Sequence, residues 1–154
     1  MIEPVVVSVL SEQGEEAGYA EMEKQYKRFI GSLPDQTKAA RVFVEHWSGK
    51  GVWESIGERA RSVITSLVPK VRLETIAARY DTTGLEFFAE SPPPTTILIG
   101  EKTLVAPLAT ARQLAPVLQG KPLIVPGAAH MIPLTHAAAV VDAVQREVRH
   151  ESED

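Results

Sequence analysis

The side chain in this sequence that is best suited to proton transfer is His130. Imidazole titrates near neutral pH, which makes histidine the most common general base in enzymes. His130 lies in segment 127–136, directly after a short apolar run at residues 122–125 and before a segment with helical periodicity. This position predicts a histidine on a loop between a strand and a helix, where we expect it to act as a catalytic base.

A nucleophile for this base is missing from the sequence. The Gly-x-Ser-x-Gly motif, which presents a nucleophilic serine on a sharp turn, does not occur. The chain contains no cysteine, which excludes a thiolate nucleophile, disulfide bonds and zinc–thiolate sites. Ser48 stands in His-Trp-Ser-Gly, which does not fit the nucleophile motif. The sequence therefore predicts a base without the group that it would activate.

The other histidines do not indicate a metal site. His46, His136 and His150 have no partner at the spacing of metal ligands. We expect His136 to support the start of the last helix rather than to take part in chemistry. We expect neither a bound metal nor a cofactor.

Composition predicts an ordinary soluble globular chain. Of 154 residues, 44% are hydrophobic and 23% are charged. The net charge of −4 argues against a nucleic-acid partner, since phosphate binding needs a clustered basic surface. No apolar run approaches the roughly 18 residues that a membrane span requires. The first residues carry no basic segment typical of a secretory signal, so we expect a cytoplasmic protein without a membrane partner.

Residues 11–91 are predicted to be helical throughout. Apolar residues recur at a spacing of three to four, which predicts helices at 15–30, 37–47, 54–67, 71–80 and 84–90. The β-branched residues 5–10 would normally form a strand, although Pro4 also fits the first turn of a helix.

The last part of the chain alternates between two kinds of pattern. After Ser-Pro-Pro-Pro at 91–94, strands are predicted at 95–100 and 122–125, and helices at 108–118 and from Thr135 to about residue 148. The last helix is expected to turn four residues inward: Ala138, Val141, Val144 and Val148. This alternation predicts an α/β fold with a doubly wound parallel sheet, into which the helical region is inserted as a lid.

In this order, the segments resemble the C-terminal half of an α/β-hydrolase. Segment 127–136 is similar to the catalytic-histidine loop of that family, and residues 43–53 resemble a recurring segment of its cap domain. The resemblance implies a partial α/β-hydrolase fold: a remnant of the sixth strand at 1–10, a helical cap at 11–91, and the last strands and helices at 92–154. The first five strands and the nucleophile would then be absent.

The resemblance also implies an acid that orients His130. Family members often carry an aspartate in a Gly-x-x-Asp pattern after the seventh strand, but here the stretch at 100–103 ends in Thr103. Other members place the acid after the sixth strand, the position of Glu3. Glu3 is therefore expected to orient His130, with Glu101 as the rival acid.

The function implied is hydrolysis of a small, largely apolar substrate such as an ester, by a chain that is inactive alone. Trp47, Trp53 and Met131 are expected to line the substrate site, although large aromatic residues also commonly fill the core. The alternatives are a non-catalytic module that binds a small molecule or a partner, and a structural oligomer. The exposed edge at residues 1–4 predicts that the chain forms a homodimer, binds a separate N-terminal half, or is only marginally folded.

Overall fold

The computed structural model describes the backbone of residues 1–151 and the side chains of residues 1–146. The protein is mostly helical, with 63% of its residues in helices. The elements described are, in chain order, α1 (Val7–Glu12), α2 (Glu16–Ile30), α3 (Gln36–Ser48), α4 (Val52–Ser55), α5 (Glu58–Ser66), α6 (Val68–Tyr80), α7 (Leu85–Ala89), β1 (Ile97–Gly100), α8 (Val105–Val117), β2 (Pro122–Val125), α9 (Ile132–Thr135) and α10 (Ala137–Glu151).

The predicted α/β fold class, including a partial α/β-hydrolase sheet, is wrong. The two strands lie where they were predicted and pair in parallel, from Ile97 opposite Pro122 to Gly100 opposite Val125. They form the only sheet in the described residues, however, against ten helices. A doubly wound sheet needs further strands, and the N-terminal segment that was expected to supply one is helical.

The segment predicted as a strand at residues 5–10 is not a strand: residues 7–10 belong to helix α1, and Val6 is its N-cap. Only Ile2 joins the sheet, through an isolated parallel bridge to Leu98. Val9 and Leu10 are completely buried, and Leu10 packs with Ala106 of α8. Burial between helices therefore outweighs the intrinsic preference of β-branched residues for strands. Pro4 just before this segment is compatible with this outcome, because proline is tolerated near the start of a helix.

The helical region follows the sequence pattern closely, with two differences at its turns. Helix α3 begins as a capped helix, because the Asp35 side chain accepts a hydrogen bond from the Lys38 amide at 3.0 Å. The helix expected at 54–67 is divided into α4 and α5, which are separated at Gly57. Pro69 lies in the first turn of α6, where its missing N–H costs nothing, and does not separate two helices.

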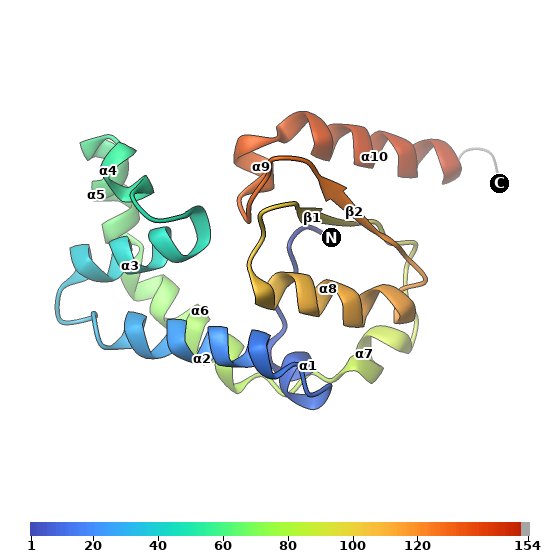
Figure 1. Ribbon diagram of the computed structural model, residues 1–154, viewed down its shortest axis with the longest axis horizontal. Coiled ribbons are helices and arrows are strands. Elements are labelled where there is room, and N and C mark those ends of the chain that lie inside the picture. Colours follow the sequence, from blue (N-terminus) through green and yellow to red (C-terminus); the bar gives the residue numbers. More distant parts are fainter. Residues whose placement is uncertain (152–154) are drawn as a thin grey trace.

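The molecule has two parts that lie side by side (Figure 1). Helices α2 to α6 form one part, and the strands with α8, α9 and α10 form the other. Alternate strand residues face opposite sides of the sheet. Ile97 and Ile99 pack against Leu114 of α8, whereas Leu98 packs with Ala143 of α10. The small sheet is therefore covered by one helix on each face.

The expected inward face of α10 is wrong. Val141 and Val144 are 51% and 57% exposed, and Ala138 is also exposed. The inward residues are Ala139, Val140 and Ala143, because these reach the cluster around Leu98 and Val125. Val148 lies outside the described side chains. Thr135 does not cap this helix: it ends α9, and its hydroxyl donates to the Met131 carbonyl.

In two helices, an amide of the first turn donates a hydrogen bond to a distant carboxylate. The carboxylate of Glu12 accepts from the Leu85 amide of α7 at 3.0 Å, and the carboxylate of Glu21 accepts from the Ala106 amide of α8 at 2.9 Å. Negative charge at a helix N-terminus is favourable because of the helix dipole. These contacts tie α1 to α7 and α2 to α8.

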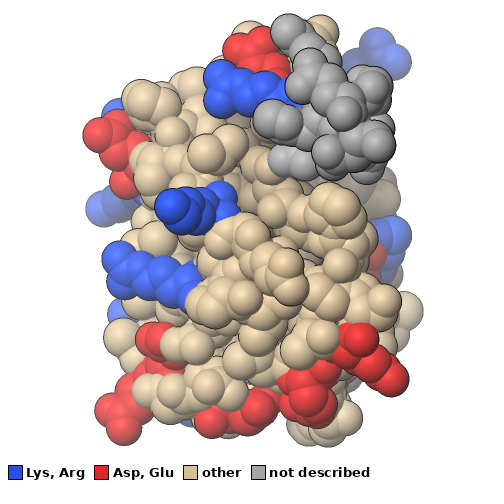
Figure 2. Space-filling view, turned by 90° about the vertical axis from the view of Figure 1, so that its right-hand side faces the viewer, with Lys and Arg blue, Asp and Glu red and all other residues tan. Residues whose placement is uncertain are grey.

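Uncharged side chains occupy the centre of the face that contains the end of α8, whereas Asp and Glu gather along its border near α1 and α7 (Figure 2). In the described part of the chain, no helix has both the length and the apolar character needed to cross a membrane.

Candidate functional site

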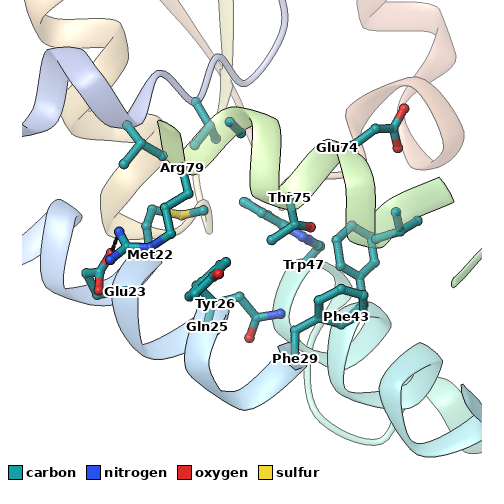
Figure 3. A pocket seen from close by; sticks show the side chains of 14 residues that line it. Met22, Glu23, Gln25, Tyr26, Phe29, Phe43, Trp47, Glu74, Thr75 and Arg79 are labelled. Atoms are coloured by element: carbon teal, nitrogen blue, oxygen red, sulfur yellow. Dashed lines mark hydrogen bonds and ion pairs between the residues drawn. The ribbon is translucent and has the colours of Figure 1, made fainter. Parts of the chain in front are cut away.

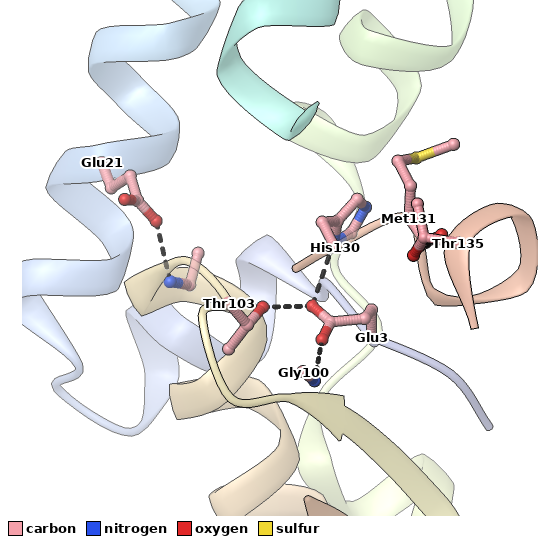
Figure 4. A network of polar contacts seen from close by, with 8 residues as sticks. Glu3, Glu21, Gly100, Thr103, His130, Met131 and Thr135 are labelled. Atoms are coloured by element: carbon pink, nitrogen blue, oxygen red, sulfur yellow. Dashed lines mark hydrogen bonds and ion pairs between the residues drawn. The ribbon is translucent and has the colours of Figure 1, made fainter. Parts of the chain in front are cut away.

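The structure brings His130 and Glu3 into direct contact, as predicted. The Nδ1 atom of His130 lies 3.1 Å from the Oε2 atom of Glu3 (Figure 4). The Glu3 side chain is only 2% exposed, whereas that of His130 is 19% exposed. The pair therefore has a buried carboxylate behind an imidazole that solvent or a reactant can reach.

Glu3 is held by groups from the end of β1. Its backbone amide donates to the Leu98 carbonyl at 2.9 Å. The Gly100 amide donates to one carboxylate oxygen, and the Thr103 hydroxyl donates to the oxygen that also contacts His130 (Figure 4). Glu3 has a φ of +47°, a left-handed conformation that is uncommon for residues with a side chain and that often marks functional sites. The contacts to Leu98 and Gly100 account for its persistence.

These contacts keep the Glu3 carboxylate ionised. Burial by itself raises the pKa of Glu3, but the hydrogen bonds from His130, Gly100 and Thr103 together lower it below its ordinary value of 4.5. Three donors on one carboxylate favour the charged form. An ionised Glu3 prefers a proton on the Nδ1 atom of His130, which leaves Nε2 as the proton acceptor.

The loop that carries His130 packs closely against the end of β1. A Cβ atom at position 100 would lie 2.5 Å from the Ala128 carbonyl oxygen and 2.9 Å from that of Ala129. The Lys102 amide also donates to the Ala128 carbonyl, at 2.8 Å. Glycine is required at position 100 because a larger residue would push away the backbone just before His130.

The rival acid does not contact His130. The Glu101 carboxylate instead accepts a hydrogen bond from the Gly127 amide at 2.8 Å. Glu101 therefore fixes the start of the histidine loop, and Glu3 is the acid that pairs with the imidazole.

Trp47 lies against the imidazole of His130. The two ring centroids are 4.1 Å apart and the rings are inclined by 30°, which is a stacked arrangement. His46 contacts the same indole from another direction, with ring centroids 4.5 Å apart. Burial, with smaller contributions from Arg28 and His130, lowers the pKa of His46 to about 4. His46 is therefore neutral at neutral pH and adds no charge beside the Glu3–His130 pair.

The other residues predicted for the site have different places. Trp53 is 5% exposed and packs in the core cluster around Phe29. Met131 follows His130 in the chain and precedes α9 (Figure 4). His136 lies between α9 and α10, where its Nδ1 atom is 2.9 Å from the Thr135 hydroxyl. His150 lies outside the described side chains.

A nucleophile is not found beside His130. Within the described residues, no serine or threonine hydroxyl forms a hydrogen bond with its ring, and the Thr103 hydroxyl is directed to Glu3. The same part of the chain contains no group of three His, Cys, Asp or Glu side chains that could hold a metal ion.

No protein-family model, curated protein or solved structure matches this chain. The relationship to the α/β-hydrolases thus stays a prediction from the resemblance of its segments.

Two features of the structure were not foreseen from the sequence. Thr103 stands where the family pattern has an aspartate, and the sequence analysis interpreted it only as the absence of an acid. In the structure, its hydroxyl donates a hydrogen bond to Glu3. Gln25 lies on the apolar face of α2 and is 5% exposed. Its position between Met22 and Phe29 at helical spacing could have predicted that burial.

Proposed function

We propose that Glu3 and His130 are the proton-transfer pair of a hydrolase that acts on a small, largely apolar substrate such as an ester. The observation that carries the proposal is the contact of 3.1 Å between Nδ1 of His130 and the buried carboxylate of Glu3. A carboxylate in this place fixes the imidazole tautomer and stabilises the imidazolium that forms when the ring accepts a proton. The resemblance of segment 127–136 to the catalytic-histidine loop of α/β-hydrolases supports the same role.

The proposed step begins with attack of a hydroxyl oxygen on the ester carbonyl carbon. The hydroxyl proton moves to Nε2 of His130, and the ionised Glu3 stabilises the resulting charge. The carbon–oxygen bond of the leaving group then breaks, and the imidazolium returns the proton to the departing oxygen. At this point the acyl group is bound to the attacking oxygen and the leaving group has departed as an alcohol. A water molecule, whose proton also moves to Nε2 of His130, then attacks the acyl carbon; the acid is released and the imidazolium returns the proton to the hydroxyl oxygen.

In this proposal, the nucleophilic hydroxyl is not supplied by any of the described residues of the same chain. Because no described hydroxyl contacts the imidazole, we expect the chain alone to hydrolyse esters poorly. A separate polypeptide or a second copy of the chain would then complete the site, in the cytoplasmic setting that the sequence predicts.

An added alcohol can replace the missing hydroxyl in a test. The chain is mixed with p-nitrophenyl acetate and increasing trifluoroethanol, and release of p-nitrophenol is followed by absorbance. We expect an alcohol-dependent acceleration of up to about 10²-fold, the lower end of what general-base catalysis supplies. His130→Ala should abolish the acceleration, and Glu3→Gln should reduce it.

The matched control for this experiment is His136→Ala, which removes an imidazole from the same loop region but not from the pair. This variant should keep the full acceleration. Equal alcohol-dependent rates in the unmodified chain and in His130→Ala would overturn the proposal, since the base would then contribute nothing.

A further inference from the structure

A cavity of about 200 Å³ lies between α2, α3 and α6. Its walls are mainly apolar and include four aromatic side chains: Tyr26, Phe29, Phe43 and Trp47. Figure 3 shows these side chains around the space between α2 and α6. Trp47 also stacks on His130, so a single indole ring separates the cavity from the imidazole.

The side chain of Gln25 lines this cavity with both of its polar atoms unpartnered. Gln25 is 5% exposed and lines the space, and neither its Nε2 nor its Oε1 atom has a hydrogen-bond partner among the described residues. Its amide lies among the aromatic rings, facing the space between α2 and α6 (Figure 3). A buried amide without partners is costly, and such groups are rare in proteins unless a ligand or water satisfies them.

The charged residues on the cavity wall are already neutralised. Arg79 forms an ion pair with Glu23, and its guanidinium carbon lies 4.8 Å from the centre of the Tyr26 ring. Glu74 is paired with Lys70. Because both charges are paired, the cavity favours a ligand without net charge. Nε of Arg79 has no hydrogen-bond partner among the described residues, but Gln25 is the lining residue whose whole polar group is unpartnered.

The size of the cavity limits the ligand to one ring and a small substituent. An apolar cavity of about 150 Å³ is enough for benzene, and the space here is about 200 Å³. The Gln25 amide offers one acceptor and a donor group side by side. A carboxamide on the ligand offers the complementary pair.

We propose that the cavity between α2, α3 and α6 binds a neutral, ring-sized molecule through a carboxamide that pairs with the amide of Gln25. The sequence also allows a non-catalytic module that binds a small molecule, and this inference names the chemical class of that molecule. It stands on residues other than Glu3 and His130 and does not require turnover.

Three probes of nearly equal shape test this recognition. Benzamide has a donor and an acceptor, acetophenone has only the acceptor, and α-methylstyrene has neither. Affinities for the unmodified chain are measured by calorimetry, and the side-chain amide signal of Gln25 is followed by NMR. We expect benzamide to bind about tenfold more tightly than α-methylstyrene, with acetophenone between them, and to shift the Gln25 signal.

Gln25→Met keeps the length of the side chain and removes both hydrogen-bonding groups. In this variant we expect the preference for benzamide to disappear while α-methylstyrene still binds. The matched control is Gln145→Met on the exposed side of α10, which should keep the preference of the unmodified chain. Equal affinities for the three probes, a preference that survives in Gln25→Met, or absence of saturable binding would each overturn the inference.

The two proposals fail separately. Selective binding of benzamide without alcohol-dependent ester cleavage would retain the cavity inference and contradict the proton-transfer pair. Cleavage that needs His130 but no selectivity among the probes would do the reverse.

Discussion

At the scale of single residues, the site depends on the hydrogen bonds that the Glu3 carboxylate accepts. Glu3 is almost completely buried, and a buried carboxylate is unfavourable unless donors surround it. His130, the Gly100 amide and the Thr103 hydroxyl are these donors. The charged form of Glu3 is therefore an integral part of the folded state, and its titration should be visible in stability.

The pKa of Glu3 predicts a pH dependence of the free energy of unfolding. Because the folded-state pKa lies below the ordinary value of 4.5, the unfolded chain binds more protons in the interval between the two values, and stability rises with pH there. The stabilisation is fully present above pH 4.5 and is lost as the pH falls through the lower, folded-state pKa. Chemical denaturation across this acid range measures it.

Glu3→Gln should remove this acid transition and lower stability at pH 7 by about 1–3 kcal/mol, since buried donors lose their charged acceptor. The two stability curves should therefore converge at low pH. Glu16→Gln, an exposed substitution at the start of α2, serves as the control with little change. Parallel curves for the unmodified chain and Glu3→Gln would show that the carboxylate is not held as described.

At the scale of elements, the site depends on the close approach of β1 and the histidine loop. The register of the two strands places Gly100 opposite Val125, and the loop that follows crosses directly over the glycine. The absence of a side chain at position 100 thus sets the distance between His130 and the groups that hold Glu3.

Gly100→Ala should separate the loop from the strand. The added Cβ atom would meet backbone atoms at 2.5–2.9 Å, which predicts a loss of stability of about 1–3 kcal/mol from overpacking. The NMR signals of the His130 ring should change as well, because its contact with Glu3 is disturbed. Thermal or chemical unfolding and the ring signals together measure the effect.

Gly57→Ala is the control for this substitution. A Cβ atom at Gly57 has no neighbour within 4 Å, and its position before α5 limits the cost to below about 1 kcal/mol. The His130 signals should not respond to it. If Gly100→Ala left both stability and the His130 signals unchanged, the loop would not be positioned by this contact.

At the scale of the whole molecule, a sheet of two strands leaves apolar surface exposed. Ile124 of β2 is 54% exposed, and Leu134 of α9 is 77% exposed. The N-terminal segment is joined to the sheet by the isolated bridge between Ile2 and Leu98. Exposed strand edges and apolar side chains favour association with a second chain.

We therefore expect the chain to form a dimer or a larger species in solution. Size-exclusion chromatography with light scattering measures the mass, and Ile124→Lys should shift the distribution towards the monomer. Lys121→Arg, which keeps the charge at a neighbouring position, is the control. A compact monomer that melts cooperatively at all concentrations would contradict the prediction.

Periodicity predicted most of the helical segments and the positions of both strands, because the local spacing of apolar residues reflects the face that is buried. The pairing of Glu3 with His130 was also predicted, although only through a resemblance of segments. Local patterns failed where distant contacts decide. Residues 7–10 are helical because α8 buries Leu10, and α10 turns Ala143 rather than Val144 towards the sheet. The roles of Thr103 and Gln25 also depend on distant contacts. Only the tertiary structure places the Glu3 carboxylate beside Thr103 and an aromatic cavity beside Gln25.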